Sequence, residues 1–254
     1  MVTKLAPERH DLIWGSRDTE PWYPNPDGLR TAEVWFPSGE LLIKFLFTTD
    51  SLSVQVHPND EQAQKAGKPR GKTEMWHILR AEPGARIALG LKHAVTAEEL
   101  RAAALDGSIV DLLNWIPVSA GQSFFVPAGT LHAIGAGIAL CEIQQLADIT
   151  YRLYDWGRGR ELHLEQGIAV SLLDSVGECP VDLPVVSRYF ETARVAVAGS
   201  REVAAADRAA TWISIEGSGL FAGQAFEAGD VFRVEAAPFR IESDGAVFLT
   251  TVEG

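Results

Sequence analysis

The chain has 254 residues, few cysteines, and fewer basic than acidic residues. The two cysteines, Cys141 and Cys179, belong to no C-x-x-C pair, so we expect neither a disulfide framework nor a thiolate zinc site. The formal net charge of −12 argues against nucleic-acid binding, which needs a concentrated positive surface. An anionic ligand would have to be held by a few local basic groups.

Long apolar runs are also lacking. The first residues, MVTKLAPERHDLIWG, contain no apolar core of a signal peptide, and no run is long enough to span a bilayer. With 46% apolar residues the chain can still bury a large core. We therefore expect a folded cytoplasmic protein without a membrane partner, as a monomer or homodimer.

Most of the chain reads as short β-strands. Runs rich in β-branched and aromatic residues are separated by Gly, Pro, Asn or Asp, which is typical of a barrel or sandwich. The runs before residue 160 are TAEVWF, LLIKFLF, SVQVH, TEMWHIL, RIALGL, SFFV, LHAI, ALCEIQQ and ITYRLYDW.

Two helical segments interrupt the strands. One is predicted over 96–114, where Thr96 and Glu99 have capping-box spacing and Gly107 breaks the run. The second, ELHLEQGIAVSLLD, lies in a connector over 161–184. Strand patterns resume over 185–254 without any histidine. We expect a larger domain over 1–160 that holds any metal site, and a smaller β domain after the connector.

The stretch SVQVHP, followed later by KTEMWHIL, groups polar side chains among strand residues. Alternate residues of a strand share a face, so Gln55 and His57 project together. Glu74 shares a face with Trp76 and Ile78, which directs a carboxylate inward among large apolar groups. A buried carboxylate needs a partner, and a metal ion is one possibility.

A further ligand comes from GQSFFVPAGTLHAIGA. Its spacing of Gly121, Pro127, Gly129 and His132 resembles the second cupin motif, in which a proline-glycine turn presents a strand histidine to a metal inside a jelly-roll barrel. That motif ends with asparagine four residues after the histidine, where this chain has Ala136.

Five motifs carry a resemblance to a known family: Q-V-H-P, K-T-E, P-A-G-T-L-H, E-I-Q-Q and Y-R-L-Y-D-W. With these motifs, the chain resembles the type I phosphomannose isomerases, especially the short bacterial form. The likeness covers roughly residues 5–175. It implies a mainly β fold: a cupin jelly-roll barrel with a short helical insertion, and a second, smaller cupin-like β domain without metal ligands. It further implies metal-dependent interconversion of mannose 6-phosphate and fructose 6-phosphate through a cis-enediol.

The resemblance also implies site residues. The metal ligands fall on Gln55, His57, Glu74 and His132, and zinc is the family's usual metal. Two imidazoles, a carboxylate and an amide oxygen suit Zn²⁺, although Mn²⁺, Co²⁺ or Fe²⁺ would fit such a site as well.

Three residues are candidates for catalysis: Lys72, two residues before Glu74; Glu142, in ALCEIQQ; and Arg152, ten residues after Glu142. Lys72 could move protons, Glu142 could be a buried base, and Arg152 could hold the enediolate or the phosphate. The residues do not decide which group is the base.

Simpler interpretations of these residues stay open. Glu142 and Arg152 could form an ion pair on adjacent strands, and Lys72 could be a solvated loop charge. We expect His77, on the face opposite Glu74, to be structural, and His10, His93 and His163 to be surface or packing residues. Trp14, Glu33 and Trp35 match family positions near the cavity wall.

Other functions stay open too. They are isomerisation of another phosphorylated or free sugar, a cupin oxygenase, which normally offers more imidazoles to iron, and a sugar-binding bicupin without catalysis.

Overall fold

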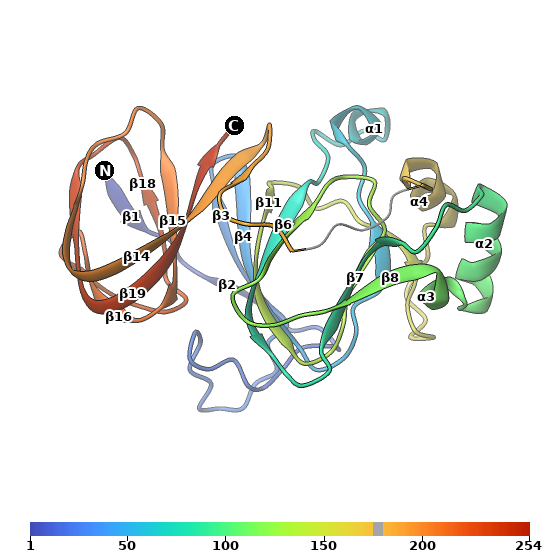
Figure 1. The fold of residues 1–254 in the computed structure, drawn as a ribbon, viewed down its shortest axis with the longest axis horizontal. Coiled ribbons are helices and arrows are strands. Elements are labelled where there is room, and N and C mark those ends of the chain that lie inside the picture. Colours follow the sequence, from blue (N-terminus) through green and yellow to red (C-terminus); the bar gives the residue numbers. More distant parts are fainter. Residues whose placement is uncertain (175–179) are drawn as a thin grey trace.

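The computed structural model describes residues 1–174 and 180–254, and its strands form three antiparallel sheets. Cys179 and part of the predicted connector lie outside the described residues. Figure 1 shows the sheets as a C-terminal barrel beside a larger one, with helices on the far side of the larger barrel. No described helix is long and apolar enough to cross a membrane.

The larger barrel is made of two facing sheets. The first has six strands, in the order β2 (Glu8–His10), β3 (Glu33–Ser38), β4 (Leu41–Thr48), β11 (Ile138–Gln145), β6 (Glu74–Ala81) and β9 (Ser123–Val126). The second has five, in the order β12 (Tyr151–Tyr154), β5 (Val54–Val56), β10 (His132–Ile134), β7 (Arg86–Leu91) and β8 (Leu113–Pro117).

A third sheet of eight strands forms the C-terminal barrel. Its main order is β1 (Val2–Lys4), β18 (Val231–Val234), β15 (Ala210–Glu216), β19 (Phe239–Glu253), β14 (Phe190–Val203) and β13 (Val185–Val186); β16 (Ser218–Phe221) pairs with β17 (Gln224–Glu227) and β19. The first strand of the chain therefore belongs to the sheet formed by its last residues.

The layers pack through separate apolar cores. Inside the larger barrel, apolar side chains of the two sheets pack against each other. The six-stranded sheet contributes Leu46, Trp76 and Leu140, and the five-stranded sheet contributes Ile87 and Leu89. The opposite face of the six-stranded sheet packs on the C-terminal barrel, so every residue of β4 is buried. Burial on both faces explains why LLIKFLF lacks simple alternation of polar and apolar residues.

The outer face of the five-stranded sheet is covered by helices. They are α2 (Ala97–Asp106), α3 (Ile109–Leu112) and α4 (Leu164–Val170), while α1 (Asp60–Lys65) lies in the loop between β5 and β6. The expected capping box of Thr96 and Glu99 starts α2, and Gly107 ends it in the left-handed region at φ 88°. The helical prediction over 96–114 extends too far, because Leu113 already pairs with Leu91 in the sheet.

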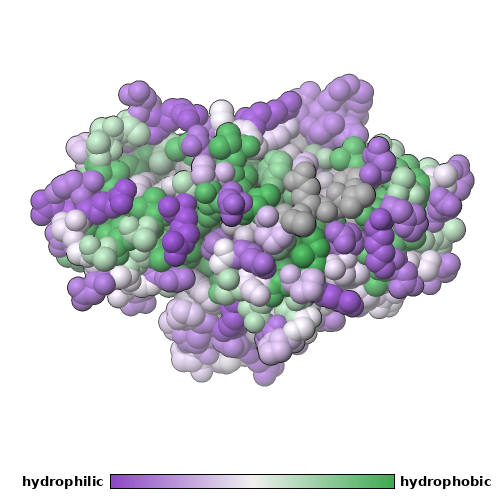
Figure 2. Space-filling view, in the orientation of Figure 1, coloured by the Kyte–Doolittle hydropathy of each residue, from purple (hydrophilic) through white to green (hydrophobic). Residues whose placement is uncertain are grey.

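The fold is mainly β and matches the expected cupin architecture. On the face drawn in Figure 2, hydrophilic side chains occupy much of the outline and hydrophobic ones lie in patches between them. Helices α2, α3 and α4 form one outer layer, so the interior between the two sheets of the larger barrel is left to strand side chains.

Candidate active site

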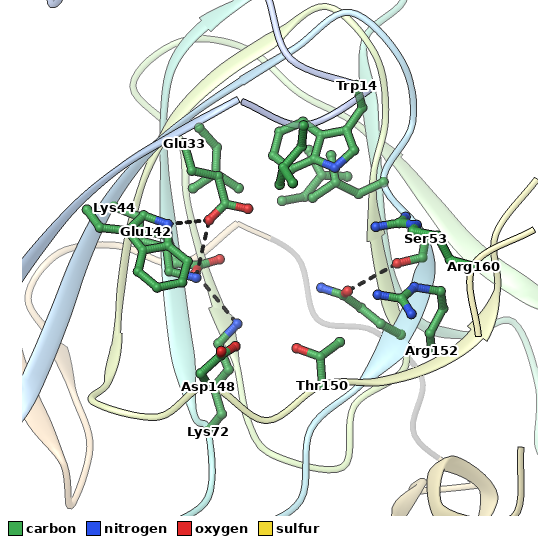
Figure 3. Close-up of a pocket in the computed structure, with 16 residues that line it drawn as sticks. Trp14, Glu33, Lys44, Ser53, Lys72, Glu142, Asp148, Thr150, Arg152 and Arg160 are labelled. Carbon is green, nitrogen blue, oxygen red and sulfur yellow. Dashed lines mark hydrogen bonds and ion pairs between the residues drawn. The ribbon is translucent and has the colours of Figure 1, made fainter. Parts of the chain in front are cut away.

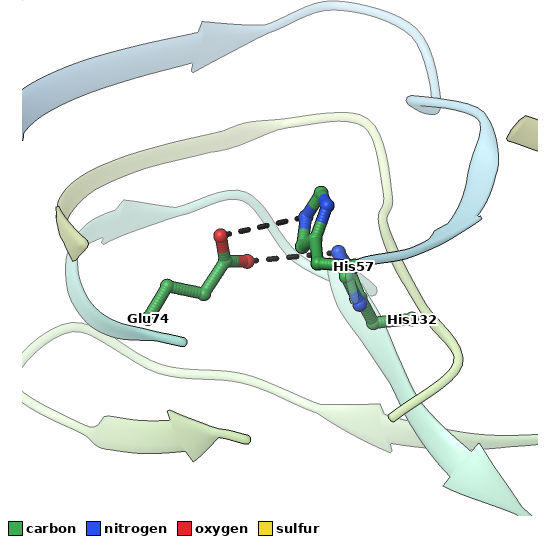
Figure 4. Close-up of side chains that lie close together, drawn as sticks. All are labelled: His57, Glu74 and His132. Carbon is green, nitrogen blue, oxygen red and sulfur yellow. Dashed lines mark ion pairs between the residues drawn. The ribbon is translucent and has the colours of Figure 1, made fainter. Parts of the chain in front are cut away.

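Three buried side chains converge inside the larger barrel. His57 follows β5, Glu74 begins β6 and His132 begins β10. His57 Nε2 lies 3.6 Å from Glu74 Oε2, and His132 Nε2 lies 3.6 Å from Glu74 Oε1 (Figure 4). Each of the three is at most 1% exposed. Segments far apart in the sequence thus bring two imidazoles to one carboxylate.

Backbone carbonyls orient both imidazoles. His57 Nδ1 lies 2.9 Å from the Ile149 carbonyl oxygen, and His132 Nδ1 lies 2.9 Å from the Thr130 carbonyl oxygen. Since a carbonyl only accepts, each Nδ1 carries the hydrogen and each Nε2 presents a lone pair. Burial also lowers the pKa of His132 to about 4 and that of His57 well below its usual value, so both rings stay neutral. Neutral Nε2 atoms that face a carboxylate are suited to a metal.

Gln55 lies beside this group. It is the cross-strand partner of His132, and its Nε2 lies 3.2 Å from His132 Nε2. Ser53 Oγ donates a hydrogen bond of 3.3 Å to Gln55 Oε1. Rotation of the Gln55 side-chain amide by half a turn about its Cγ–Cδ bond would exchange its oxygen and nitrogen. The oxygen would then lie next to His132 Nε2, where it could be a metal ligand.

These residues fit a divalent metal ion. Glu74 Oε1 is buried and accepts no hydrogen bond, and such an atom needs a compensating partner. The possible ligand atoms of His57, Glu74 and His132 all lie within 4.8 Å of one another. Ligands of a tetrahedral zinc ion lie roughly 3.3–3.6 Å apart, given bonds of about 2.0–2.2 Å, and the imidazole–carboxylate distances are close to this.

A second group of charges adjoins the three. Lys72 Nζ lies 2.7 Å from Glu74 Oε2, 3.2 Å from His57 Nε2 and 3.6 Å from Glu142 Oε1. Lys44 Nζ lies 3.5 Å from Glu142 Oε1, and Trp76 Nε1 donates a hydrogen bond of 3.0 Å to Glu142 Oε2. Lys72 is 5% exposed, so the alternative of a solvated loop charge is wrong.

The charges of this group shift one another's pKa values. Burial, reinforced by the negative charge of Glu142, raises the pKa of Glu74 to about 7. Burial alone would also raise the pKa of Glu142, but attraction by Lys72 and Lys44 outweighs it and holds the pKa below its usual value. The two carboxylates likewise raise the pKa of Lys72 against the effect of burial. Glu142 is therefore kept ionised and Lys72 protonated.

A cavity of about 270 Å³ opens onto these residues. Gln55 and Lys72 line it and also contact the imidazole–carboxylate group, which joins the cavity to the candidate metal position. Figure 3 shows Glu33, Lys44 and Glu142 on one wall and Ser53, Arg152 and Arg160 on the other. The remaining lining residues are Leu12, Trp14, Trp35, Leu46, Leu52, Ile134, Asp148 and Thr150.

The arginine wall is organised by a buried carboxylate. Asp155, 3% exposed, accepts hydrogen bonds from Arg160 at 2.5 and 2.8 Å and from Arg158 Nη2 at 2.9 Å. Arg152 Nη1 donates to the Glu161 carbonyl oxygen at 2.8 Å, and Arg152 Nε is buried without a partner. Burial and the nearby charge of Arg160 lower the pKa of Arg152. Asp50 is also paired with Arg158 at 3.5 Å, so two carboxylates face three guanidinium groups and the wall keeps a net positive charge.

The alternative of a Glu142–Arg152 ion pair on adjacent strands is wrong. Glu142 is on β11, between β4 and β6 in the six-stranded sheet, whereas Arg152 is on β12, at the edge of the five-stranded sheet. Lys44 and Lys72 form the ion pairs of Glu142. Arg152 is instead the cross-strand partner of Gln55.

Sequence reasoning missed several cavity residues, namely Lys44, Ser53, Asp148, Thr150 and Arg160. Lys44 could have been found, because it is the one charged residue in the apolar run LLIKFLF and points to the same side as Leu46. Arg160 gives no such signal, since it lies in the irregular segment GRGRE after β12. Trp14, Glu33 and Trp35 line the cavity as expected.

The other histidines lie outside the cavity lining. His77 is buried on the opposite face of β6, with Nδ1 2.9 Å from Ser123 Oγ. The His10 ring packs on Trp35 with centroids 4.2 Å apart, and His163 Nδ1 accepts a hydrogen bond from the Arg152 amide. His93 is exposed.

In sequence, part of the chain is similar to curated mannose-6-phosphate isomerases. No family model matches the chain. The mannose-6-phosphate isomerase of Streptococcus mutans is 48% identical over 136 residues, which are 51% of this chain and 43% of that protein. The chain spans less than half the length of the first curated relatives it matches.

Similarity to solved structures extends over nearly the whole chain. The mannose 6-phosphate isomerase of Bacillus subtilis superposes with a TM-score of 0.86 at 25% identity over 98% of both chains. A zinc-bound mannose 6-phosphate isomerase superposes with a TM-score of 0.78 at 15% identity over 99% of both chains, a likeness of fold alone. The chain is therefore a homologue of mannose-6-phosphate isomerases and has the cupin fold of type I phosphomannose isomerases.

Proposed function

We propose that the protein is a metal-dependent aldose–ketose isomerase that interconverts mannose 6-phosphate and fructose 6-phosphate through a cis-enediol. The observation that carries this proposal is the placement of an ionised carboxylate and a protonated amine, Glu142 and Lys72, beside the candidate metal ligands in one cavity. Isomerisation of this kind needs a base at carbon and a proton donor at oxygen, and both must act close to a positive charge.

The metal, which we propose to be zinc, would be held by Gln55, His57, Glu74 and His132. The same donors would accept Mn²⁺, Co²⁺ or Fe²⁺. A bound divalent ion would supply positive charge that lowers the cost of negative charge on the substrate oxygens. The neutral imidazoles, each held by a backbone carbonyl, and the unpartnered Oε1 of Glu74 support this assignment.

Glu142 is the proposed carbon base. Its depressed pKa keeps it ready to accept the proton of the carbon next to the carbonyl, and the same carboxyl group returns that proton to the neighbouring carbon. Lys72 gives a proton to the carbonyl oxygen of the sugar and recovers one from the neighbouring hydroxyl oxygen, so each turnover restores the protonated amine that the adjacent carboxylates favour by raising its pKa. Lys44 keeps Glu142 oriented and ionised.

Arg152 and Arg160 are proposed to hold the phosphate. They face the cavity from the wall opposite Glu142, so a sugar phosphate bound between the walls has its anionic end at the guanidinium groups and its carbonyl end at the base (Figure 3). Guanidinium groups bind phosphate oxygens through paired, charge-assisted hydrogen bonds. A sugar-binding protein without catalysis would need no buried base at the carbonyl end.

The direct test is a coupled assay of mannose 6-phosphate conversion with metal-stripped protein, before and after zinc is restored. We expect turnover only with metal. Absence of turnover with zinc, manganese or cobalt, despite stoichiometric metal binding, would contradict the assignment. Conversion of mannose 6-phosphate slower than that of another phosphorylated or free sugar would redirect the substrate assignment and keep the reaction type.

We also propose a division into a catalytic domain over 1–160, a connector over 161–184 and a C-terminal β domain over 185–254. A cytoplasmic location and a monomeric or homodimeric state are further proposals. The C-terminal barrel has an apolar core of its own, which includes Trp212, Phe221 and Phe248 and supports the proposed division.

A further inference from the structure

The segment Lys72–Thr73–Glu74 carries a proposed proton donor and a proposed metal ligand on either side of Thr73. The β6 strand begins only at Glu74, so Lys72 and Thr73 lie beyond its regular pairing. Lys72 and Glu74 nevertheless hold side chains 2.7 Å apart in a fully buried position. Their geometry therefore depends on what fixes the peptide groups of Thr73.

Gln145 binds both backbone groups of Thr73. The Thr73 amide donates a hydrogen bond of 2.8 Å to Gln145 Oε1, and the Gln145 amide donates one of 3.1 Å to the Thr73 carbonyl oxygen. The register of β6 and β11 ends at the Glu74–Gln144 pair. The backbone and side chain of Gln145 together extend that pairing by one residue, to the residue between Lys72 and Glu74.

Asp60 orients the Gln145 amide. Gln145 Nε2 donates a hydrogen bond of 2.9 Å to Asp60 Oδ1, which also accepts one of 2.9 Å from the Gly71 amide. Because Asp60 accepts on one side and the Thr73 amide donates on the other, only one orientation of the Gln145 amide satisfies both. Gln145 is 4% exposed, so water is a poor substitute for either partner.

Neighbouring contacts connect this pair to the metal-ligand segments. The Lys72 amide donates to the Pro58 carbonyl oxygen at 3.0 Å, next to His57, and the Ala128 amide donates to Thr73 Oγ1 at 3.3 Å, in the turn before His132. Gly71 has no room for a side chain, since an added Cβ would lie 2.4 Å from the Pro58 carbonyl oxygen. The amide, carbonyl and hydroxyl groups of Thr73 are thus all hydrogen-bonded, to Gln145 and Ala128.

We propose that Gln145, oriented by Asp60, is a positioning residue that sets the relative placement of Lys72 and Glu74. This inference rests on the proposed function, because it assigns Gln145 an effect on proton transfer and metal binding. Gln145 lies outside the cavity lining and touches no proposed reacting atom, so it acts through Thr73. A displacement of about 1 Å at a catalytic group can lower turnover about 100-fold.

The test compares Gln145→Leu, which keeps the approximate size and removes both side-chain hydrogen bonds, with the unchanged protein. We expect kcat for mannose 6-phosphate to fall about 10- to 100-fold and zinc affinity to fall about 10-fold. KM should change less than about threefold, because the arginine wall is on another sheet. Zinc affinity is measured by competition with a chromogenic chelator, independently of activity.

A conservative pair separates positioning from general loss of stability. Asp60→Asn keeps the Oδ1 acceptor and should retain at least half of kcat, whereas Asp60→Leu removes it and should reproduce most of the loss in Gln145→Leu. Arg188→Ala removes the outer ion pair of Asp60 and a cation–π contact with Tyr189, at a side chain that is 71% exposed, and should leave kcat and zinc affinity unchanged. Val197→Ala, in the core of the C-terminal barrel, should lower Tm without lowering kcat.

The outcomes are distinct. If Gln145→Leu and Asp60→Leu lose thermal stability but keep kcat and zinc affinity, the positioning role is overturned. It is also overturned if Asp60→Asn loses as much activity as Asp60→Leu. If Gln145→Leu fails to fold, the two Asp60 variants decide the question. If the unchanged protein neither binds zinc nor isomerises the sugar, the proposed function itself fails.

Discussion

Arg152 is the direct cross-strand partner of Gln55, and Gln55 is in turn the partner of His132 on the neighbouring strand. Three adjacent strands of one sheet therefore present the proposed substrate arginine and two proposed metal ligands in a single row. Backbone ladders fix the spacing of such a row, so it does not depend on the metal. The site should persist as a folded structure when ligands are removed.

The first prediction concerns His132→Ala. We expect bound zinc to fall from one equivalent to near zero and turnover to drop more than about 100-fold, because His57 would then be the one imidazole left among the described residues of the metal-ligand group. His77→Gln is the matched control, since it removes a buried imidazole from the other face of β6. Metal content is measured by atomic absorption. Full zinc occupancy in His132→Ala would contradict the ligand assignment.

Glu142→Gln tests the base. The amide keeps the shape and can still accept from Trp76, but it cannot take a proton, so kcat should fall about 100- to 10,000-fold with metal retained. Glu33→Gln is the control, because Glu33 lies on the same wall with Lys44 Nζ 3.4 Å away. A loss of kcat in Glu33→Gln as large as in Glu142→Gln would argue for a purely electrostatic role. Hydrogen exchange from the substrate carbon into solvent measures the proton transfer directly.

Arg160→Met tests phosphate binding. Loss of a charge-assisted contact worth about 1.5–3 kcal/mol should raise KM for mannose 6-phosphate, and the inhibition constant of inorganic phosphate, about 10- to 100-fold. Turnover of unphosphorylated mannose, where detectable, should not change. Arg158→Met is the comparison, since Arg158 also binds Asp155 but does not line the cavity. Equal effects of the two substitutions would point to disruption around Asp155 and away from phosphate contact.

His77 should make the fold sensitive to acid. Burial, with a smaller effect from Arg194, lowers the pKa of His77 to about 4, whereas an unfolded chain has the ordinary value near 6.5. Above pH 6.5 His77 is neutral in both the folded and the unfolded protein, so its titration does not change the free energy of unfolding. As pH falls below 6.5 the unfolded state gains the proton first, so stability decreases until the folded state is protonated near pH 4.

The size of this loss can be measured with His77→Gln. Between pH 7.5 and pH 4.5, urea unfolding of the unchanged protein should lose about 2–3 kcal/mol more than that of the variant. Other titrating groups are common to both proteins and cancel in the difference. The same pH dependence in both proteins would show that His77 does not titrate as its burial implies.

The sequence predicted the strands well. It also predicted on which face of the sheet each side chain lies, wherever the side chains alternate regularly between the two faces. Glu74, Trp76 and Ile78 share the inner face of β6, while Met75 packs in the core on the other side. Turn chemistry also identified Gly107 as a helix end. Local features of this kind depend on neighbouring residues and survive in any tertiary setting.

Long-range features could not be predicted in this way. Leu113 and Asn114 continue a helical pattern but join β8, because pairing with β7 outweighs local preference. Asp155, the partner of both Arg158 and Arg160, sits in a motif whose sequence does not indicate where its carboxylate points. Gln145 likewise shows no sign in E-I-Q-Q that it binds Thr73, seventy-two positions away.

The pairing of β1 with β18 has a consequence for synthesis of the chain. Val2 lies opposite Val234, so a strand that is made before the larger barrel has its partner among residues made after it (Figure 1). Closure of so long a loop is slow compared with local hairpin formation. The larger barrel, whose strands lie between β1 and β18 in the sequence, can therefore assemble before the C-terminal barrel gains its edge strand.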